Sequence, residues 1–170
     1  NDYMIRKLNK PYDENGVLAA QGTADPNVVA RFLLDDYFVR PAPKSLDRDD
    51  FPYISSLVES LSVADAAATL TAIIVAGVSQ ALEYMPQYPK QMWITGGGRK
   101  NRELMRLLQS ALPMQVCDID EMGFDGDMVE AHAFAYLAAR VARGLPTSFL
   151  KTTGVATPLS GGKVSPVGIG

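Results

Sequence analysis

The sequence contains few of the residues that most often reveal a function. Its 170 residues include one cysteine, Cys117, and one histidine, His132. A single cysteine excludes a framework of internal disulfides and fits a reducing compartment. We assign no chemistry to His132, because a lone histidine on a helix is more often structural. The net charge of −3 shows no basic excess, so we expect no nucleic-acid partner.

Long apolar runs are also scarce. The longest run within the apolar central part of the chain, Ile73 to Val78, is too short to span a bilayer, and we therefore expect no membrane segment. Apolar residues nevertheless make up 47% of the chain and charged residues 21%, which is enough for one domain with a buried core. The first residue is Asn1 rather than methionine, which fits either a processed start or a piece of a longer protein.

Helical patterns dominate the first half of the chain. Ser62, followed by Asp65 three residues later, forms a capping pattern at the start of the longest predicted helix, Ser62 to Met85. That helix is apolar on most sides, which is typical of a buried helix. Asp25-Pro26 predicts the start of a shorter helix, with the aspartate as N-cap and the proline in the first turn.

Two strands are predicted in the second half of the chain. Gln91 to Thr95 and Gln115 to Asp118 flank a helix that follows Gly98 and ends before Pro113. A strand, a helix and a strand favour a parallel pair joined by a right-handed crossover, with Cys117 as a reduced core thiol. Two strands are too few to cover so much apolar helix surface. Either the helices pack mainly on each other, or further strands lie upstream and are absent from this chain.

A last clear helix is predicted from Asp127 to Arg143. Asp127 and Glu130 repeat the cap spacing, and the apolar face of the helix is expected to be buried. That face consists of Val129, Phe134, Leu137 and Val141. From Thr147 onward the chain is rich in Thr, Gly, Pro and Ser, which predicts an extended tail with at most a short strand.

The most informative local motif is a strand that runs into Gly96, Gly97 and Gly98. Glycine lets the backbone approach a ligand closely, and the following helix start presents unpaired N–H groups and a positive dipole end. The turn is neither a Walker loop nor a G-x-G-x-x-G fingerprint. The residues alone leave two interpretations open, a nucleotide-binding turn and a tight connection between strand and helix.

A loop from Arg40 to Asp50 gathers three anion-friendly side chains. They are Lys44, Ser45 and Arg48. The loop is either a ligand-facing segment or a solvated connector.

Several segments occur in the order found in one protein family. They are Lys10-Pro11-Tyr12-Asp13, Asp36-Tyr37-Phe38, Pro43-Lys44-Ser45, Ala68-Thr69-Leu70-Thr71-Ala72, the triple glycine with Asn101, Val129-Glu130-Ala131, Ala133-Phe134-Ala135, Gly144-Leu145-Pro146 and Thr153-Gly154. The chain resembles the C-terminal half of the anhydro-N-acetylmuramic acid kinases. The resemblance implies an α/β, helix-rich, RNase H-like lobe of the actin and sugar-kinase type, with residues 1–170 forming most of the second lobe and part of its sheet missing upstream.

The resemblance also implies a reaction. The family phosphorylates 1,6-anhydro-N-acetylmuramic acid with ATP in peptidoglycan recycling, while water opens the anhydro ring to give N-acetylmuramic acid 6-phosphate. ATP with Mg²⁺ is the implied cofactor, because phosphoryl transfer requires charge neutralisation. A cytoplasmic location and a homodimer are implied as well. No metal-ligand set is evident in the sequence, and Asp118 and Asp120 are interpreted as loop charges.

The resemblance assigns roles to particular residues. It implies that Gly96–Gly98 form the adenosine-side turn, with Asn101 as a polar contact or simply a helix cap. It implies that Glu130 is a catalytic carboxylate that helps orient the attacking water. Lys44 and Ser45 are the implied substrate contacts, although Leu46-Asp47 stands where the family has Thr-Gly.

Two motifs of the family do not occur in this sequence. One is an N-terminal Gly-Thr-Ser-x-Asp-Gly phosphate loop. The other, Asp-Thr-Gly-Pro-(Gly/Ala)-Asn, carries the catalytic base and would end just before Asn1; Phe124-Asp125-Gly126-Asp127 is similar but lies too late in the chain. We therefore expect a fragment that is inactive alone and whose partner is the N-terminal lobe of the same protein. Two alternatives stay open: a kinase of another sugar, and a non-catalytic helical module that binds a protein through exposed apolar faces.

Overall fold

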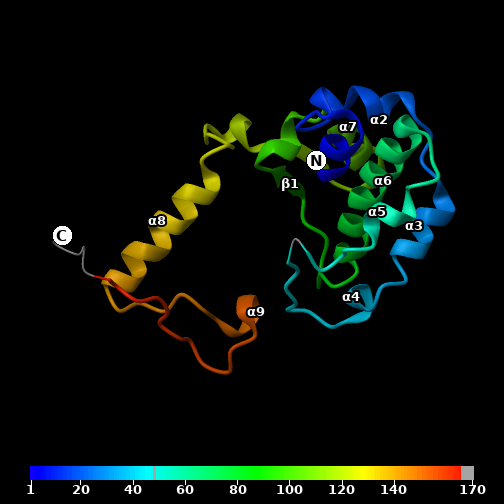
Figure 1. Ribbon diagram of the computed structural model, residues 1–170. Coiled ribbons are helices and arrows are strands. Elements are labelled where there is room, and N and C mark those ends of the chain that lie inside the picture. Colours follow the sequence, from blue (N-terminus) through cyan, green and yellow to red (C-terminus); the bar gives the residue numbers. More distant parts are fainter. Residues whose placement is uncertain (48, 166–170) are drawn as a thin grey trace.

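The computed structural model describes residues 1–47 and 49–165. It shows a helical body, a small sheet, and an arm that leads away from the body toward the C-terminus (Figure 1). The elements in chain order are α1 (Asp2–Leu8), η1 (Glu14–Gly16), α2 (Val17–Gln21), α3 (Pro26–Phe32), α4 (Asp36–Val39), α5 (Ile54–Leu57), α6 (Val63–Leu82), β1 (Gln91–Ile94), η2 (Gly97–Lys100), α7 (Arg102–Ala111), β2 (Gln115–Asp118), η3 (Ile119–Met122), α8 (Val129–Ala142) and α9 (Leu150–Thr153). The described chain is α/β and rich in helix, as the sequence predicts.

The central element is α6, which contacts α2, α3 and α7. Its N-cap is Ser62, whose hydroxyl oxygen accepts a hydrogen bond from the backbone N–H of Asp65 at 3.1 Å. The Asp65 carboxylate accepts from the Thr23 backbone at 2.7 Å, so it ties the loop before α3 to the start of α6. The predicted cap is confirmed, and the helix ends at Leu82 rather than at Met85.

As a whole, α6 is long and apolar enough to cross a membrane, although the uninterrupted run inside it is short. This criterion uses length and composition only, and a core helix passes it equally. Two polar side chains within α6 are satisfied locally, because the Thr69 and Thr71 hydroxyls donate to the carbonyls of Asp65 and Ala67 at 2.7 and 2.8 Å. The helix therefore carries no unsatisfied polar side chain into the core.

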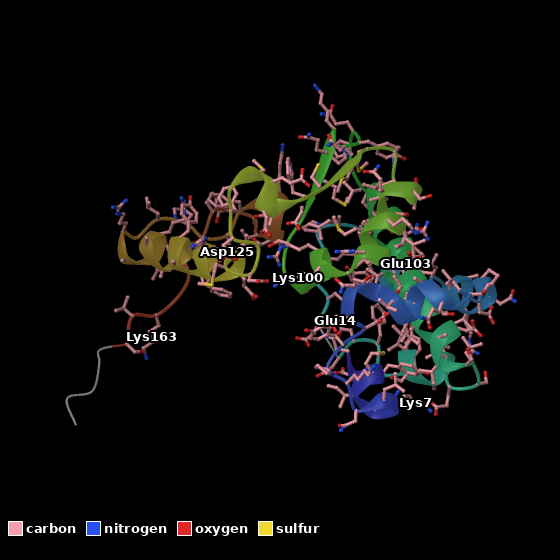
Figure 2. All side chains as sticks on the ribbon, turned by 90° about the horizontal axis from the view of Figure 1, so that it is seen from above. Lys7, Glu14, Lys100, Glu103, Asp125 and Lys163 are labelled. Carbon is pink, nitrogen blue, oxygen red and sulfur yellow. The ribbon has the colours of Figure 1, made fainter. Side chains whose placement is uncertain are left out.

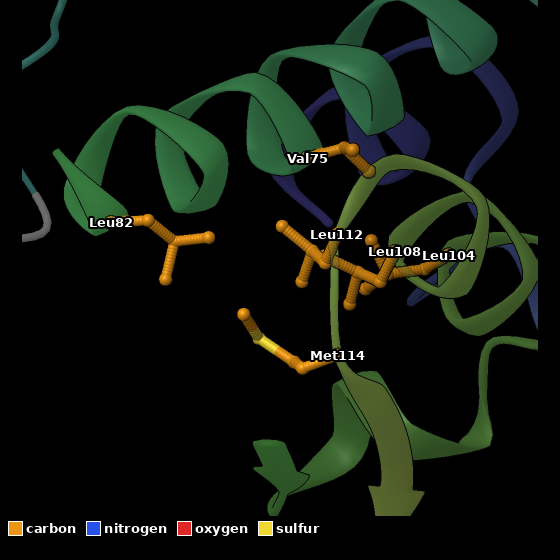
Figure 3. Close-up of a cluster of buried hydrophobic side chains, with 6 residues drawn as sticks. All are labelled: Val75, Leu82, Leu104, Leu108, Leu112 and Met114. Atoms are coloured by element: carbon orange, nitrogen blue, oxygen red, sulfur yellow. The ribbon is translucent and has the colours of Figure 1, made fainter. Parts of the chain in front are cut away.

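A parallel pair of strands, β1 and β2, forms the sheet of the described chain. Trp93 stands opposite Cys117 in the register, and the crossover between the strands contains α7. Apolar side chains from α6, α7 and the loop after it meet beside the sheet (Figure 3). They are Val75, Leu82, Leu104, Leu108, Leu112 and Met114. The predicted strands, their parallel pairing and the buried position of Cys117 are confirmed.

Two further apolar clusters join the N-terminal helices to α6. One combines α1 with Val58 and Ala66, and the other combines Phe32 and Phe38 with Ile73. The body of the molecule is thus built mainly of helix packed on helix, which is one of the two arrangements that the strand shortage allowed.

The arm begins at α8, and here the structure corrects the sequence prediction. No residue of α8 is buried, and Phe134 and Leu137 are 63% and 36% exposed. Val129 and Val141 are only half-buried. The predicted apolar face exists, but no element of the described chain lies over it, because the sheet has only two strands there. After Gly144, which adopts a left-handed φ of 63°, the chain turns back and forms one antiparallel bridge between Ser148 and Leu159.

The start of α8 also differs from the prediction. Its N-cap is Met128, without a side-chain cap hydrogen bond, rather than Asp127. The Asp127 carboxylate instead accepts hydrogen bonds from Arg99 and Lys100 at 2.7 and 2.6 Å. Two full positive charges outcompete an exposed backbone N–H for this carboxylate.

Candidate functional site

The glycine turn connects β1 to α7 and opens on a cavity. Gly96 has a φ of 69°, a conformation that favours glycine, and the chain then forms the short helix η2. A Cβ atom built on Gly96 or Gly97 would meet nothing within 4 Å, so the backbone faces open space there. Gly97, Gly98 and Asn101 line a cavity of about 650 Å³, whereas Gly96 does not.

The cavity has an apolar floor and a polar rim. Ala67, Leu70 and Ile74 of α6 form part of the floor, and Lys100 contributes a positive charge at the turn. A short segment, residues 12–15, between α1 and α2 also lines the cavity. Glu14 of this segment and Lys100, both labelled in Figure 2, line the same cavity. A hollow with this lining can hold a flat, partly apolar ring. The Lys100 ammonium also bonds to Asp127 at 2.6 Å, and Asp13 and Glu14 add negative charge to the lining.

Asn101 serves first as a helix cap. Its side-chain oxygen accepts from the backbone N–H of Leu104 at 2.9 Å and so begins α7. The cap interpretation is therefore confirmed, while the side chain also lies at the cavity wall. Gly16 of η1, which the sequence analysis missed, lies directly against it. A Cβ atom on Gly16 would come within 2.1 Å of the Asn101 Oδ1, so only glycine lets α7 start this close to η1.

Glu130 lies in the first turn of α8, on the arm. It is exposed and is not part of the cavity wall. Within the described residues its side chain makes no hydrogen bond and no ion pair. Its carboxylate is thus free to act on a ligand or on a segment outside this chain. The role that the resemblance implies for it stays a prediction.

Lys44 and Ser45 lie at a second, shallower hollow of about 360 Å³, lined also by Arg40, Pro41 and Pro43. The Lys44 ammonium donates to the carbonyls of Tyr37 and Phe38 at 2.8 and 3.3 Å. It also lies over the rings of Tyr37 and Tyr84, at 4.6 and 4.1 Å from their centroids.

These contacts give Lys44 a structural role, holding the end of α4 against the turn after α6. The Ser45 carbonyl accepts from Arg40 at 3.1 Å. Neither residue lines the cavity at the glycine turn, so the structure does not bring the two groups of candidates together. Arg48, the third anion-friendly residue of this loop, lies outside the described residues.

The charged cluster around Arg99 is the main feature that the sequence analysis missed. The Arg99 side chain is 4% exposed, and its guanidinium lies 3.3, 3.2 and 2.7 Å from carboxylate oxygens of Asp118, Asp120 and Asp127. Hydrogen bonds from Arg99 and Lys100 lower the pKa of Asp127 to about 2.

The backbone N–H of Gly126, followed by Arg99, lowers the pKa of Asp120. Three carboxylates on one guanidinium are an ion-pair network. Asp118 and Asp120, which the sequence analysis interprets as loop charges, thus pair with Arg99. In the part of the chain that the structure describes, no group of three or more His, Cys, Asp or Glu side chains could hold a metal ion.

Comparison with known proteins identifies the family. The sequence profile of "Anhydro-N-acetylmuramic acid kinase" matches residues 1–167. Relatives with that name include those of Roseobacter denitrificans, 52% identical over 165 residues, and Cereibacter sphaeroides, 50% identical over 165 residues. In both cases the match covers 97% of this chain and 44% of the relative. The chain thus spans less than half the length of these relatives. It belongs to the anhydro-N-acetylmuramic acid kinase family.

Proposed function

We propose that this chain forms the nucleotide side of an ATP-dependent kinase of 1,6-anhydro-N-acetylmuramic acid. The observation that carries the proposal is the glycine turn on a 650 Å³ cavity with an apolar floor and a lysine at its rim. The floor suits an adenine ring, and Gly97 and Gly98 leave room for the backbone to approach the nucleotide. Lys100 supplies positive charge for the phosphates.

The proposed reaction joins phosphoryl transfer to ring opening. A water oxygen bonds to C1 of the sugar as the C1–O6 bond breaks, and its proton passes to a catalytic base. The freed O6 takes the γ-phosphoryl group, the bond between the β- and γ-phosphates breaks, and ADP leaves. Glu130 orients the water in this scheme, and the base lies in a segment outside this chain. The products are N-acetylmuramic acid 6-phosphate and ADP.

Mg²⁺ when bound neutralises charge on the transferred phosphates. The residues described here do not offer a ligand set for it, because the carboxylates after β2 are occupied by Arg99. Mg²⁺ is commonly held by substrate phosphates with one or two carboxylates, and we therefore place its protein ligands outside this chain. We further propose a cytoplasmic, homodimeric enzyme in cell-wall recycling.

Substitution of Gly97 tests the nucleotide site directly. Gly97 has no positive φ and a Cβ there meets nothing within 4 Å, so Gly97→Val should fold normally while filling the space the ligand needs. We expect ATP binding, measured by isothermal titration calorimetry, to weaken about tenfold or more. Gly123→Ala is the control, since Gly123 lies outside the cavity. Equal binding by Gly97→Val and the unchanged chain would place the nucleotide elsewhere.

The substrate is tested with the complete protein. The chain is joined to the upstream half that its relatives possess, and ADP release is followed with the anhydro-sugar, with N-acetylmuramic acid and with N-acetylglucosamine as acceptors. We expect turnover with the anhydro-sugar and none by the 170-residue chain alone. Turnover only with another acceptor supports the alternative of a different sugar kinase.

The exposed apolar face of α8 favours a second candidate, a module that binds a protein. On that face Phe134 and Leu137 are 63% and 36% exposed, which leaves apolar surface available to a partner. We infer that the occupant is the upstream half of the same polypeptide, because the chain covers only 44% of its relatives. Amide exchange distinguishes the upstream half from a separate protein as the occupant of this face. The amides of α8 should become protected in the complete protein if the upstream half covers them, and should stay unprotected if the face binds another protein.

A further inference from the structure

Arg99 joins three segments that lie far apart in the sequence. Its Nη1 donates to the Gly96 carbonyl at 3.0 Å and to Asp127 at 2.7 Å, just before α8. Its Nη2 donates to Asp120, just after β2, at 3.2 Å. One planar guanidinium thus connects the glycine turn, the end of the sheet and the beginning of the arm.

The backbone around Arg99 is built to receive it. A Cβ atom on Gly126 would lie 2.4 Å from the Arg99 Nε, so a larger residue there would displace the guanidinium. The Gly126 carbonyl accepts from the Gly96 N–H and from the Thr95 hydroxyl, both at 3.0 Å. The Gly126 N–H in turn donates to Asp120 at 2.7 Å. These bonds and those of Arg99 link the glycine turn to the start of the arm. We call the linked residues, Gly96, Arg99, Asp120, Gly126 and Asp127, the joint.

The joint bears on function because the arm is attached to the body here, and otherwise approaches it where Gly154 lies beside Pro43. No residue of α8 is buried, and the arm leaves the body at this point (Figures 1 and 2). Glu130 follows Asp127 by three residues, in the first turn of that helix. The direction in which Glu130 points relative to the cavity therefore depends on the joint. The guanidinium stays protonated, because hydrogen bonds to Asp127 and Asp120 raise the pKa of Arg99.

We propose that Arg99 is a positioning residue that holds the glycine turn and the helix bearing Glu130 in one fixed arrangement. Its hydrogen bond to the Gly96 carbonyl holds the glycine turn of the proposed nucleotide site in place. Its hydrogen bond to Asp127 holds the start of the helix that carries Glu130. The inference rests on the proposed function for its kinetic consequences, but not for its structural ones. If Arg99 instead only neutralises acidic residues, lysine should replace it, because lysine carries the same charge without the planar fork.

The structural consequence is measured in this chain by hydrogen exchange. In Arg99→Lys we expect the amides of Gly96 and Gly126 to exchange about tenfold faster or more. The groups that accept from these amides, the Gly126 carbonyl and the Asp120 carboxylate, are then no longer held in place by the guanidinium. Arg106→Lys is the matched control: Arg106 is an exposed arginine of α7 that, in the described part of the chain, pairs with Glu103. Exchange in Arg99→Lys that equals the unchanged chain overturns the proposal, as does equal acceleration in the control.

The kinetic consequence is measured in the complete protein. Asp127→Asn removes the charge at the arm, leaves the bond between Arg99 and Gly96 in place, and weakens the bond that Lys100 makes to Asp127 at 2.6 Å. We expect kcat to fall about tenfold to a hundredfold, as small misplacements of a catalytic group do. The KM for ATP should not rise, because Lys100 loses its acidic partner and stays available to the phosphates. Because the effect passes through Glu130, Asp127→Asn should add little to Glu130→Gln.

The outcomes separate the two proposals. Independent, multiplicative effects of Asp127→Asn and Glu130→Gln overturn the positioning role. A rise in the KM for ATP without loss of kcat overturns it as well. If the complete protein transfers no phosphate to the anhydro-sugar, the proposed function fails, and the exchange experiment alone decides whether Arg99 holds the joint.

Discussion

Gly16→Ala should destabilise the chain through a contact that can be specified atom by atom. The added Cβ would lie 2.1 Å from the Asn101 Oδ1 and 2.8 Å from the Glu103 Cβ. The φ of 72° adds the left-handed cost of any L-residue, about 1–2 kcal/mol. Forcing α7 away from η1 adds an overpacking cost of about 1–3 kcal/mol. The expected loss in the free energy of unfolding is therefore about 2–5 kcal/mol.

Gly123→Ala separates the two contributions. Gly123 also has a positive φ, 81°, but a Cβ there meets nothing within 4 Å. This control should lose only the conformational part, about 1–2 kcal/mol. Changes in the entropy of the unfolded chain are the same for both substitutions and cancel in the comparison.

The measurement is urea unfolding followed by the fluorescence of Trp93, the single tryptophan, which lies in β1. Gly16→Ala should shift the midpoint further than Gly123→Ala at an unchanged slope. Equal losses in the two variants, within about 0.5 kcal/mol, would refute the reasoning. Gly16 would then be needed for its backbone angle alone, and the close approach of α7 to η1 would carry no energetic weight.

Two further predictions concern the body of the molecule. Leu108→Ala, at a side chain 2% exposed between α6 and α7, should cost about 2–5 kcal/mol by urea unfolding, whereas Leu34→Ala, at 81% exposure, should stay within about 0.5 kcal/mol. Tyr53 donates to Asp35 at 2.5 Å, and burial followed by this bond raises the pKa of Tyr53 to about 12, from 10.0. The stabilisation from a raised pKa is complete below pH 10 and is lost as pH rises to about 12. Tyr53→Phe should therefore flatten the alkaline fall in stability, and the exposed Tyr88→Phe should leave it unchanged.

The starts of α3 and α6 could be predicted because caps are local, whereas the cap predicted for α8 at Asp127 was wrong because that carboxylate binds Arg99 and Lys100. Asp25 accepts from the Asn27 backbone at 2.8 Å, and Ser62 accepts from Asp65, as the residue types and spacing require. Both strands could be predicted for the same reason, since a short β-prone run between turn signals depends on its own residues. The glycine turn was also found this way, and the structure places two of its three glycines at a cavity.

Burial and long-range pairing could not be predicted in this way. The apolar pattern of α8 is real, yet Phe134 is exposed, because burial depends on which other segment is present to cover it. The Arg99 joint depends on carboxylates 21 and 28 residues further along the chain. The parallel crossover brings these residues to the glycine turn. No local sequence pattern indicates that Arg99 pairs with these carboxylates.

The position of α6 determines how the molecule comes apart. It supplies Val75 and Leu82 to one apolar cluster, Ala66 to a second and Ile73 to a third. Because all three clusters contain side chains of α6, the loss of one cluster would weaken the packing of the others. The body should therefore unfold as one cooperative unit. The arm shares none of these clusters, and it can fray or be clipped by a protease while the rest of the chain stays folded.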